Sequence, residues 1–113
     1  MELDELQKQV VLLTRGIEHP RVGAALALAE ECGEVMRCVL DGEYYGKDVT
    51  AALQDEVGDV LISLVELCDR FGLSLEACAR STLQKVEAKA PKWRAELGGR
   101  LQELRKRMDG VES

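Results

Sequence analysis

The sequence predicts an all-α protein, and three observations support this prediction. The 113 residues include only two prolines and are rich in Ala and Leu. No segment alternates apolar and polar residues in the way that marks a half-buried strand. Apolar residues instead recur every three or four positions, as on one face of an amphipathic helix. A chain of this length forms one hydrophobic core, so we expect a single helical domain over residues 1–113.

Two helices are predicted in the N-terminal part of the chain. Apolar spacing predicts the first from about Leu3 to Thr14, and Gly16 to His19 then forms its exit. Pro20 suits the first turn of a second helix, where its missing N–H leaves no carbonyl unpaired. This second helix should end near Asp41-Gly42. The following segment, Asp41 to Lys47, is predicted to be a loop that holds both tyrosines.

A third helix is predicted to be central to the fold. Asp48 or Thr50 can cap its N-terminus, because short polar side chains accept hydrogen bonds from the first free backbone N–H groups. Its segment Val60 to Val65 is apolar on nearly every side, which is typical of a buried helix. We expect it to stop at Phe71-Gly72.

A fourth helix should begin after Ser74, its N-cap, and run to about Ala90. Pro91 is expected to break or kink the chain there, since proline cannot complete the backbone hydrogen bonds of a helix interior. A last amphipathic segment follows. Its apolar stripe consists of Trp93, Leu97, Leu101, Leu104 and Met108.

Charge and cysteine usage limit the kinds of partner. Lys and Arg number 15 against 21 Asp and Glu, and the net charge of −6 disfavours nucleic acid. The N-terminus is acidic and apolar runs are short, so we expect neither a signal peptide nor a membrane span. No C-x-x-C pair occurs among the four cysteines. We interpret them as small core residues in a reducing cytoplasm, with disulfides or a zinc site as the alternative. They are Cys32, Cys38, Cys68 and Cys78.

One six-residue phrase occurs twice, first as Glu30-Glu31-Cys32-Gly33-Glu34-Val35 and then as Asp55-Glu56-Val57-Gly58-Asp59-Val60. In each copy two acids stand three residues apart, so they project from the same helix face about one turn apart. Two such helices can place four carboxylates around one point. Hard divalent cations, Mg²⁺ above all, stabilise a cluster of this kind.

The repeated phrase also has simpler explanations. Acids at helical spacing usually mark a solvated face, but these lie in line with apolar residues that favour burial. Each mid-helix glycine costs about 1 kcal/mol relative to Ala, which either close helix approach or room for a metal would offset. A purely structural alternative is an old hairpin duplication whose glycines permit tight packing. A di-iron site is disfavoured, because such sites use Glu-x-x-His pairs and His19 is the one histidine.

The paired acids resemble a known family signature. Glu30-Glu31-x-x-Glu34, a spacer of 21 residues and Glu56-x-x-Asp59 resemble the EExxE…ExxD motif of the MazG-type nucleoside triphosphate pyrophosphohydrolases. His19-Pro20-Arg21 is similar to the segment before this motif in the dCTP pyrophosphatase branch. Leu75 to Lys89 resembles the helix on which members carry phosphate-facing basic residues. The resemblance covers Ile17 to Trp93 and implies a MazG-like bundle of four to five helices, completed by oligomerisation.

The resemblance also implies roles for individual side chains. Lys85 and Lys89 are expected at the substrate phosphates, and His19 at the nucleobase. Trp93 either joins His19 there or anchors the last helix to the core. Glu30 orients the attacking water, pairs with Lys85 or is solvated. Mg²⁺, with Mn²⁺ as a substitute, is expected on Glu31, Glu34, Glu56 and Asp59.

These features together predict an enzyme of nucleotide metabolism. Members of the family cleave a nucleoside triphosphate between the α and β phosphorus atoms, releasing a monophosphate and pyrophosphate. We expect a cytoplasmic, Mg²⁺-dependent homodimer or homotetramer that removes unwanted nucleotides and binds neither nucleic acid nor membranes. The alternative is a non-catalytic helical interaction or regulatory module of the same fold, against which the complete set of four carboxylates argues.

Overall fold

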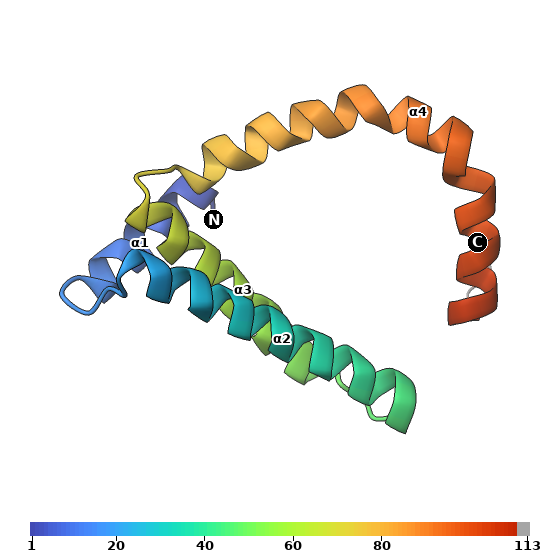
Figure 1. Ribbon diagram of the computed structural model, residues 1–113, viewed down its shortest axis with the longest axis horizontal. Helices are drawn as coiled ribbons and strands as arrows, with labels where there is room; N and C mark the ends of the chain where they lie inside the picture. Colours follow the sequence, from blue (N-terminus) through green and yellow to red (C-terminus); the bar gives the residue numbers. More distant parts are fainter. Residues whose placement is uncertain (111–113) are drawn as a thin grey trace. The chain divides into compact units, whose positions relative to one another are not determined.

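A computed structural model describes residues 1–110 of the chain and confirms the predicted all-α class (Figure 1). No strand occurs within this described part. None of its helices combines the length and apolar character that crossing a bilayer requires. The chain divides into two compact units, Met1–Cys78 and the residues from Ala79 onward. The four helices are α1 (Leu3–Thr14), α2 (Arg21–Tyr45), α3 (Thr50–Arg70) and α4 (Leu75–Asp109).

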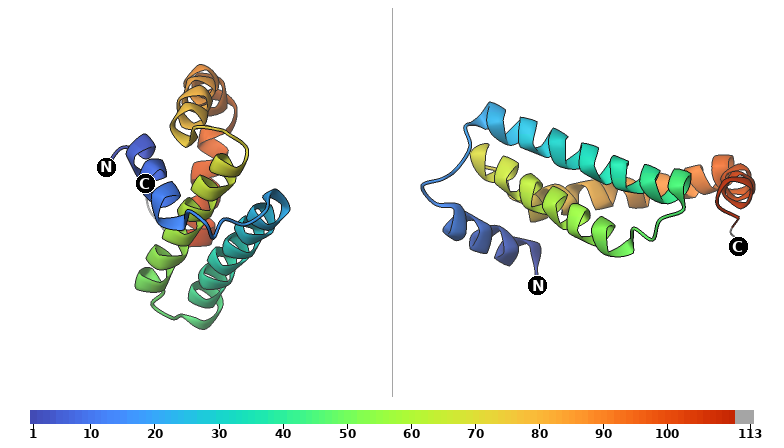
Figure 2. Two further views of the ribbon diagram at one scale, coloured as in Figure 1. Left: turned by 90° about the vertical axis from the view of Figure 1, so that its left-hand side faces the viewer. Right: turned by 90° about the horizontal axis from the view of Figure 1, so that it is seen from below.

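The first unit is built around α3. Helices α2 and α3 run antiparallel and side by side, and α1 packs against α3 as well (Figure 2). Val65, in the segment that the sequence marks as apolar on nearly every side, is completely inaccessible to solvent. The central position predicted for this helix is confirmed by its contacts with both α1 and α2, but Leu61 and Ile62 of the same segment are exposed. The other buried residues of the core are Val10, Ala24, Cys38 and Cys68.

The C-terminal end of α2 differs from the prediction. The helix does not stop at Asp41-Gly42 but continues to Tyr45, so both tyrosines lie in its last turn instead of a loop. Gly46 ends it by adopting a left-handed conformation with φ of 64°, which glycine adopts without strain. Gly42 has a different role, since a Cβ there would lie 3.0 Å from Cγ2 of Val49. Glycine at this position lets the following connection pack closely on the helix.

The cap predicted at Ser74 is confirmed, whereas the N-cap residue of α3 is Val49, with Asp48 bonding the helix from the position before it. The Asp48 carboxylate accepts a hydrogen bond of 3.1 Å from the Thr50 backbone N–H at the start of α3. The Ser74 hydroxyl accepts one of 3.1 Å from the Ala77 N–H in the first turn of α4. These bonds satisfy N–H groups that a helix start leaves unpaired.

The structure contradicts a break at Pro91, because α4 continues through it as one helix of 35 residues. The alternative, a kink at Pro91, stays a prediction. Relative to Ala, an interior proline costs about 3 kcal/mol and each glycine about 1 kcal/mol. Pro91, Gly98 and Gly99 together therefore disfavour this helix by roughly 5 kcal/mol. Helical propensity alone does not hold such a segment, and most helical stability in proteins comes from packing of an apolar face.

The predicted burial of the cysteines is confirmed for two of the four. Cys38 and Cys68 are buried, and burial raises the pKa of both thiols. Cys32 and Cys78 are exposed, so the expectation of a core position is wrong for these two. Both have apolar neighbours in the helical sequence, which is why apolar spacing suggested burial.

Candidate functional site

The antiparallel pairing of α2 and α3 brings the two acidic phrases together. Glu31 projects from α2 toward Glu56 and Asp59 on α3, and one carboxylate oxygen from each lies within 4.8 Å of the others. Glu31 and Glu56 are half-buried and Asp59 is exposed. Three acids from two helices thus converge at one point that opens to solvent.

The carboxylates at this point repel one another, and the effect is seen at Glu56. The pKa of the Glu56 carboxyl is raised, first by burial and then by the neighbouring carboxylates of Glu34, Asp59, Glu31 and Asp55. Glu34 and Glu31 belong to α2, so part of the repulsion acts across the helix pair. Each additional negative charge makes it harder for Glu56 to ionise.

The donor set fits a hard divalent cation. Carboxylate oxygens are the ligands that Mg²⁺ and Mn²⁺ prefer, whereas zinc and copper sites favour His and Cys. A cation at this point would offset the mutual repulsion of Glu31, Glu56 and Asp59. The residues that could hold it are therefore those three, together with Glu34, whose charge already acts on Glu56.

Glu56 belongs both to the acidic cluster and to the lining of a neighbouring pocket of about 320 Å³. Glu34 and Glu56 both line this pocket, and so do two cationic side chains, Arg37 and Lys47. Its volume lies at the lower end of the range for small-molecule sites. The remaining lining residues are Cys38, Asp41, Asp48, Val49 and Ala52.

Arg37 and Lys47 are not among the predicted site residues, because the family resemblance places phosphate-binding cations on the fourth helix. Arg37 stands three residues after Glu34, which places both on one face of α2 and was a readable signal. Lys47 lies in the α2–α3 connection, with its Nζ 5.8 Å from the centroid of the Tyr45 ring. Helical spacing does not predict where a loop residue such as Lys47 lies.

The two glycines of the repeated phrases lie beside open space. A Cβ built at Gly33 or Gly58 would meet no atom within 4 Å. Close approach of α2 and α3 is therefore not what requires glycine at either position. The room next to the acids remains available to a ligand.

His19 lies away from the acidic cluster. Its ring Nδ1 and its backbone N–H both contact the Glu66 carboxylate on α3. Arg21, two residues later, donates from Nε to the carbonyl of Arg70 at 3.1 Å and lies over the Phe71 ring. From Arg21 to Glu31 the helix rises by roughly 15 Å. In the first unit His19 thus ties the start of α2 to the end of α3.

The other predicted site residues are exposed. Glu30 lies on α2 about 100° around the helix from Glu31, with its side chain in solvent. Lys85, Lys89 and Trp93 belong to the second unit, as does Lys92, which forms a 4.0 Å ion pair with Glu96. The roles of these residues stay predictions.

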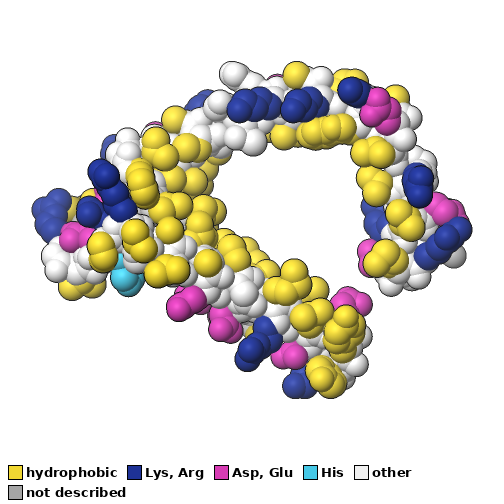
Figure 3. Space-filling model, in the orientation of Figure 1, with side chains coloured by type: hydrophobic (Ala, Val, Ile, Leu, Met, Phe, Trp, Pro, Cys, Tyr) yellow, Lys and Arg dark blue, Asp and Glu magenta, His cyan; other side chains and the backbone are white. Residues whose placement is uncertain are grey.

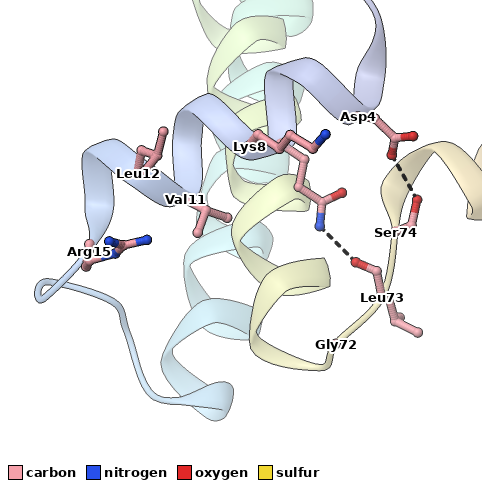
Figure 4. A pocket seen from close by; sticks show the side chains of 9 residues that line it. Asp4, Lys8, Val11, Leu12, Arg15, Gly72, Leu73 and Ser74 are labelled. Carbon is pink, nitrogen blue, oxygen red and sulfur yellow. Dashed lines mark hydrogen bonds between the residues drawn. The ribbon is translucent and has the colours of Figure 1, made fainter.

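A larger pocket, of about 590 Å³, contains none of the predicted site residues (Figure 4). It lies between α1 and the connection from α3 to α4. Hydrogen bonds cross it from Gln7 to the Leu73 carbonyl and from Ser74 to the Asp4 carboxylate. These bonds, with that from the Leu75 N–H to the Gln7 side chain, anchor the start of α4 on α1.

The fold and the acidic site define a class of protein: an all-α domain with a carboxylate centre of the kind that holds a divalent cation between two antiparallel helices. Comparison with known families gives the family itself. The model of the MazG nucleotide pyrophosphohydrolase domain matches residues 23–93, and the chain belongs to this family. The match includes both acidic phrases and ends within α4. Comparisons with curated proteins and with solved structures gave no match.

Proposed function

We propose that this protein hydrolyses (deoxy)nucleoside triphosphates between the α and β phosphates, releasing a nucleoside monophosphate and pyrophosphate. The observation that carries the proposal is the meeting of Glu31, Glu56 and Asp59 from two helices. Membership of a nucleotide pyrophosphohydrolase family supports the same conclusion.

Mg²⁺ is the proposed cofactor, with Mn²⁺ as a substitute. When bound, a divalent cation neutralises phosphate charge and lowers the pKa of a coordinated water. The residues that would hold it are Glu31, Glu34, Glu56 and Asp59. Without a cation, the negative charge of these carboxylates would repel a triphosphate. Glu30, next to this set on α2, is proposed to orient the attacking water.

Cationic side chains are proposed to receive the phosphates. Arg37 and Lys47 line the pocket that borders Glu34 and Glu56, so they can attract the triphosphate and fix its orientation beside the acids. Lys85 and Lys89 are proposed to contact the pyrophosphate end. Candidates for the nucleobase are His19 and Trp93.

Family membership also supports a biological role and an assembly state. We propose a house-cleaning enzyme that removes unwanted nucleotides from the pool in the cytoplasm and works as a homodimer or homotetramer. A non-catalytic helical module would need no convergence of carboxylates, so the acidic cluster favours the enzyme.

The test is pyrophosphate release over a panel of standard and modified nucleoside triphosphates, with and without Mg²⁺. We expect Asp59→Asn and Glu34→Gln to lower turnover by at least about 100-fold without loss of helical content. Glu43→Gln, a matched change at an exposed position in the last turns of α2, should leave turnover unchanged. Equal turnover in all three variants, or no release from any nucleotide, would contradict the proposal.

A further inference from the structure

The end of α3 brings one cysteine of the first unit next to the turn that follows. Two backbone hydrogen bonds close this end around Gly72, whose φ is 67°. The Leu73 N–H donates to the Cys68 carbonyl at 2.8 Å, and the Gly72 N–H donates to the Asp69 carbonyl at 3.1 Å. This pair of bonds is the Schellman motif, in which the residue after the glycine packs back on the last turns of the helix. Cys68 therefore lies beside Leu73.

The start of α4 directs a second cysteine to the same residue. Ser74 caps this helix with its side chain, and its carbonyl accepts a hydrogen bond of 3.0 Å from the Cys78 N–H. At such a helix start, the residue before the cap packs against the fourth helical residue. Here these two residues are Leu73 and Cys78. Because Leu73 belongs to both motifs, the turn brings Cys68 and Cys78 to one place within the first unit.

The side chains of the two cysteines interact directly. Burial is the first cause that raises the pKa of the Cys68 thiol, and the charge and the hydrogen bond of the neighbouring Cys78 thiol add to it. Cys68 is only 6% exposed, whereas Cys78 is exposed. Figure 3 shows hydrophobic side chains gathered where α3 passes into α4. A redox-sensing cysteine is typically accessible and lies next to a second cysteine that resolves its oxidised form.

We propose that Cys68 and Cys78 form a reversible disulfide when the protein meets hydrogen peroxide. The exposed Cys78 reacts first: its sulfur attacks one peroxide oxygen, the O–O bond breaks, and the thiol proton leaves with the other oxygen as water. The Cys68 sulfur then attacks the sulfenic sulfur of Cys78. The S–O bond breaks, and the hydroxyl group leaves with the Cys68 proton as a second water. Two thiols are thereby oxidised to one disulfide, and one peroxide is reduced to two waters.

The bond would act as a clamp on the turn between α3 and α4. It would join the two helices across residues 71–74, so that this turn could no longer open. Disulfides that form in a reducing compartment are usually transient and sense the redox state. The other cysteines are engaged elsewhere, since Cys38 donates to the Val49 carbonyl at 3.8 Å and Cys32 lines a separate hollow between α2 and α3.

Peptide mapping tests the proposal directly, because trypsin cleaves after Arg70, between the two cysteines. The full chain is treated with hydrogen peroxide, free thiols are blocked with N-ethylmaleimide, and the digest is analysed by mass spectrometry without reductant. We expect peptides 48–70 and 71–80 to be joined, and dithiothreitol to separate them. The denatured protein should still be a single chain, lighter by the mass of two hydrogen atoms. Joined peptides that contain Cys32 instead, or a Cys78 sulfinic acid without any joined pair, would overturn the proposal.

A thermal melt provides a second, independent measurement. Peroxide should raise the melting temperature of the parent by roughly 5 °C or more, since a cross-link restricts the unfolded chain, and dithiothreitol should reverse the increase. Cys78→Ser changes an exposed position and should keep its helical content but lose this increase. Cys32→Ser, the matched control, removes another exposed cysteine and should respond as the parent does. No increase in the parent, or an equal increase in Cys78→Ser, would overturn the proposal. Neither readout depends on whether the protein hydrolyses nucleotides.

Discussion

Replacing Glu56 by glutamine tests the acidic cluster most directly. The side chain keeps its shape but loses its charge at a point where burial, and then four other carboxylates, raise the pKa of Glu56. In protein freed of metal by a chelator, Glu56→Gln removes repulsion from the folded state. We therefore expect the variant to melt at a higher temperature than the parent without metal, although it has lost a native side chain.

Magnesium should reverse the order of the two proteins. At a concentration ten times its dissociation constant, Mg²⁺ stabilises the parent by RT ln 11, about 1.4 kcal/mol. For a domain of this size that corresponds to an increase in melting temperature of roughly 5–10 °C. If loss of the carboxylate weakens binding on the order of 100-fold, the variant gains less than about 0.1 kcal/mol at the same concentration. Its melting temperature should then rise by less than about 1 °C.

The stability difference between Glu56→Gln and the parent should also depend on pH. Because the folded state raises the pKa of Glu56 above its ordinary value of 4.5, the proton binds the folded chain more tightly than the unfolded chain. The stability contributed by the protonated form is complete below pH 4.5 and is lost as pH rises through the raised pKa. Without metal, the advantage of Glu56→Gln should therefore be absent below pH 4.5 and grow above it.

The assay is a thermal melt followed by far-UV circular dichroism, at one protein concentration, with chelator and with Mg²⁺. Glu43→Gln serves as the control for loss of an acid at an exposed position, and its melting temperature should change little in either condition. A metal-free Glu56→Gln protein that melts below the parent, or one with an undiminished magnesium shift, would refute the metal centre.

The remaining predictions concern substrate binding and folding. Arg37→Gln should raise the KM for the triphosphate at least about tenfold with an unchanged melting temperature; an unaltered KM would exclude this residue from the phosphate site. Lys85→Ala should likewise weaken nucleotide binding in titration calorimetry, and loss of stability with full affinity would make it structural. Val65→Ala should lower the free energy of unfolding by about 2 kcal/mol in a urea titration, because Val65 is fully buried. Asp48→Ala should lower the melting temperature at neutral pH but not in acid, where protonation already removes the charge that the Thr50 N–H stabilises.

The sequence predicted the ends of helices well where one or two neighbouring residues determine them. The helix-start hydrogen bonds of Asp48 and Ser74 and the left-handed glycine at position 72 are signals carried by one or two residues. The predicted helix end at Gly42 was wrong because this glycine allows close contact with Val49. Helical spacing does not predict that contact, since it forms only when the chain turns back after the helix. A glycine that permits contact and a glycine that ends a helix look alike in a sequence.

Predictions about the site also succeeded where helical spacing decides and failed where the tertiary structure decides. Helical spacing was enough to place Glu31, Glu56 and Asp59 on faces that could converge, and the structure brings their oxygens together. It could not show that Lys47 would reach the neighbouring pocket, since that depends on the path of a loop. Nor could spacing show that His19 would contact Glu66, which requires the register of α2 against α3.

With the proposed function, the open space beside Gly33 and Gly58 makes these positions favourable starting points for changing substrate preference. In most enzymes, reshaping the site reduces stability, and the scaffold must tolerate that loss. Here a methyl group at either position would collide with nothing and would favour the helix by about 1 kcal/mol. Selection for a different nucleotide could therefore begin with variants that fold better than the parent. The margin gained would then accommodate less favourable changes elsewhere in the site.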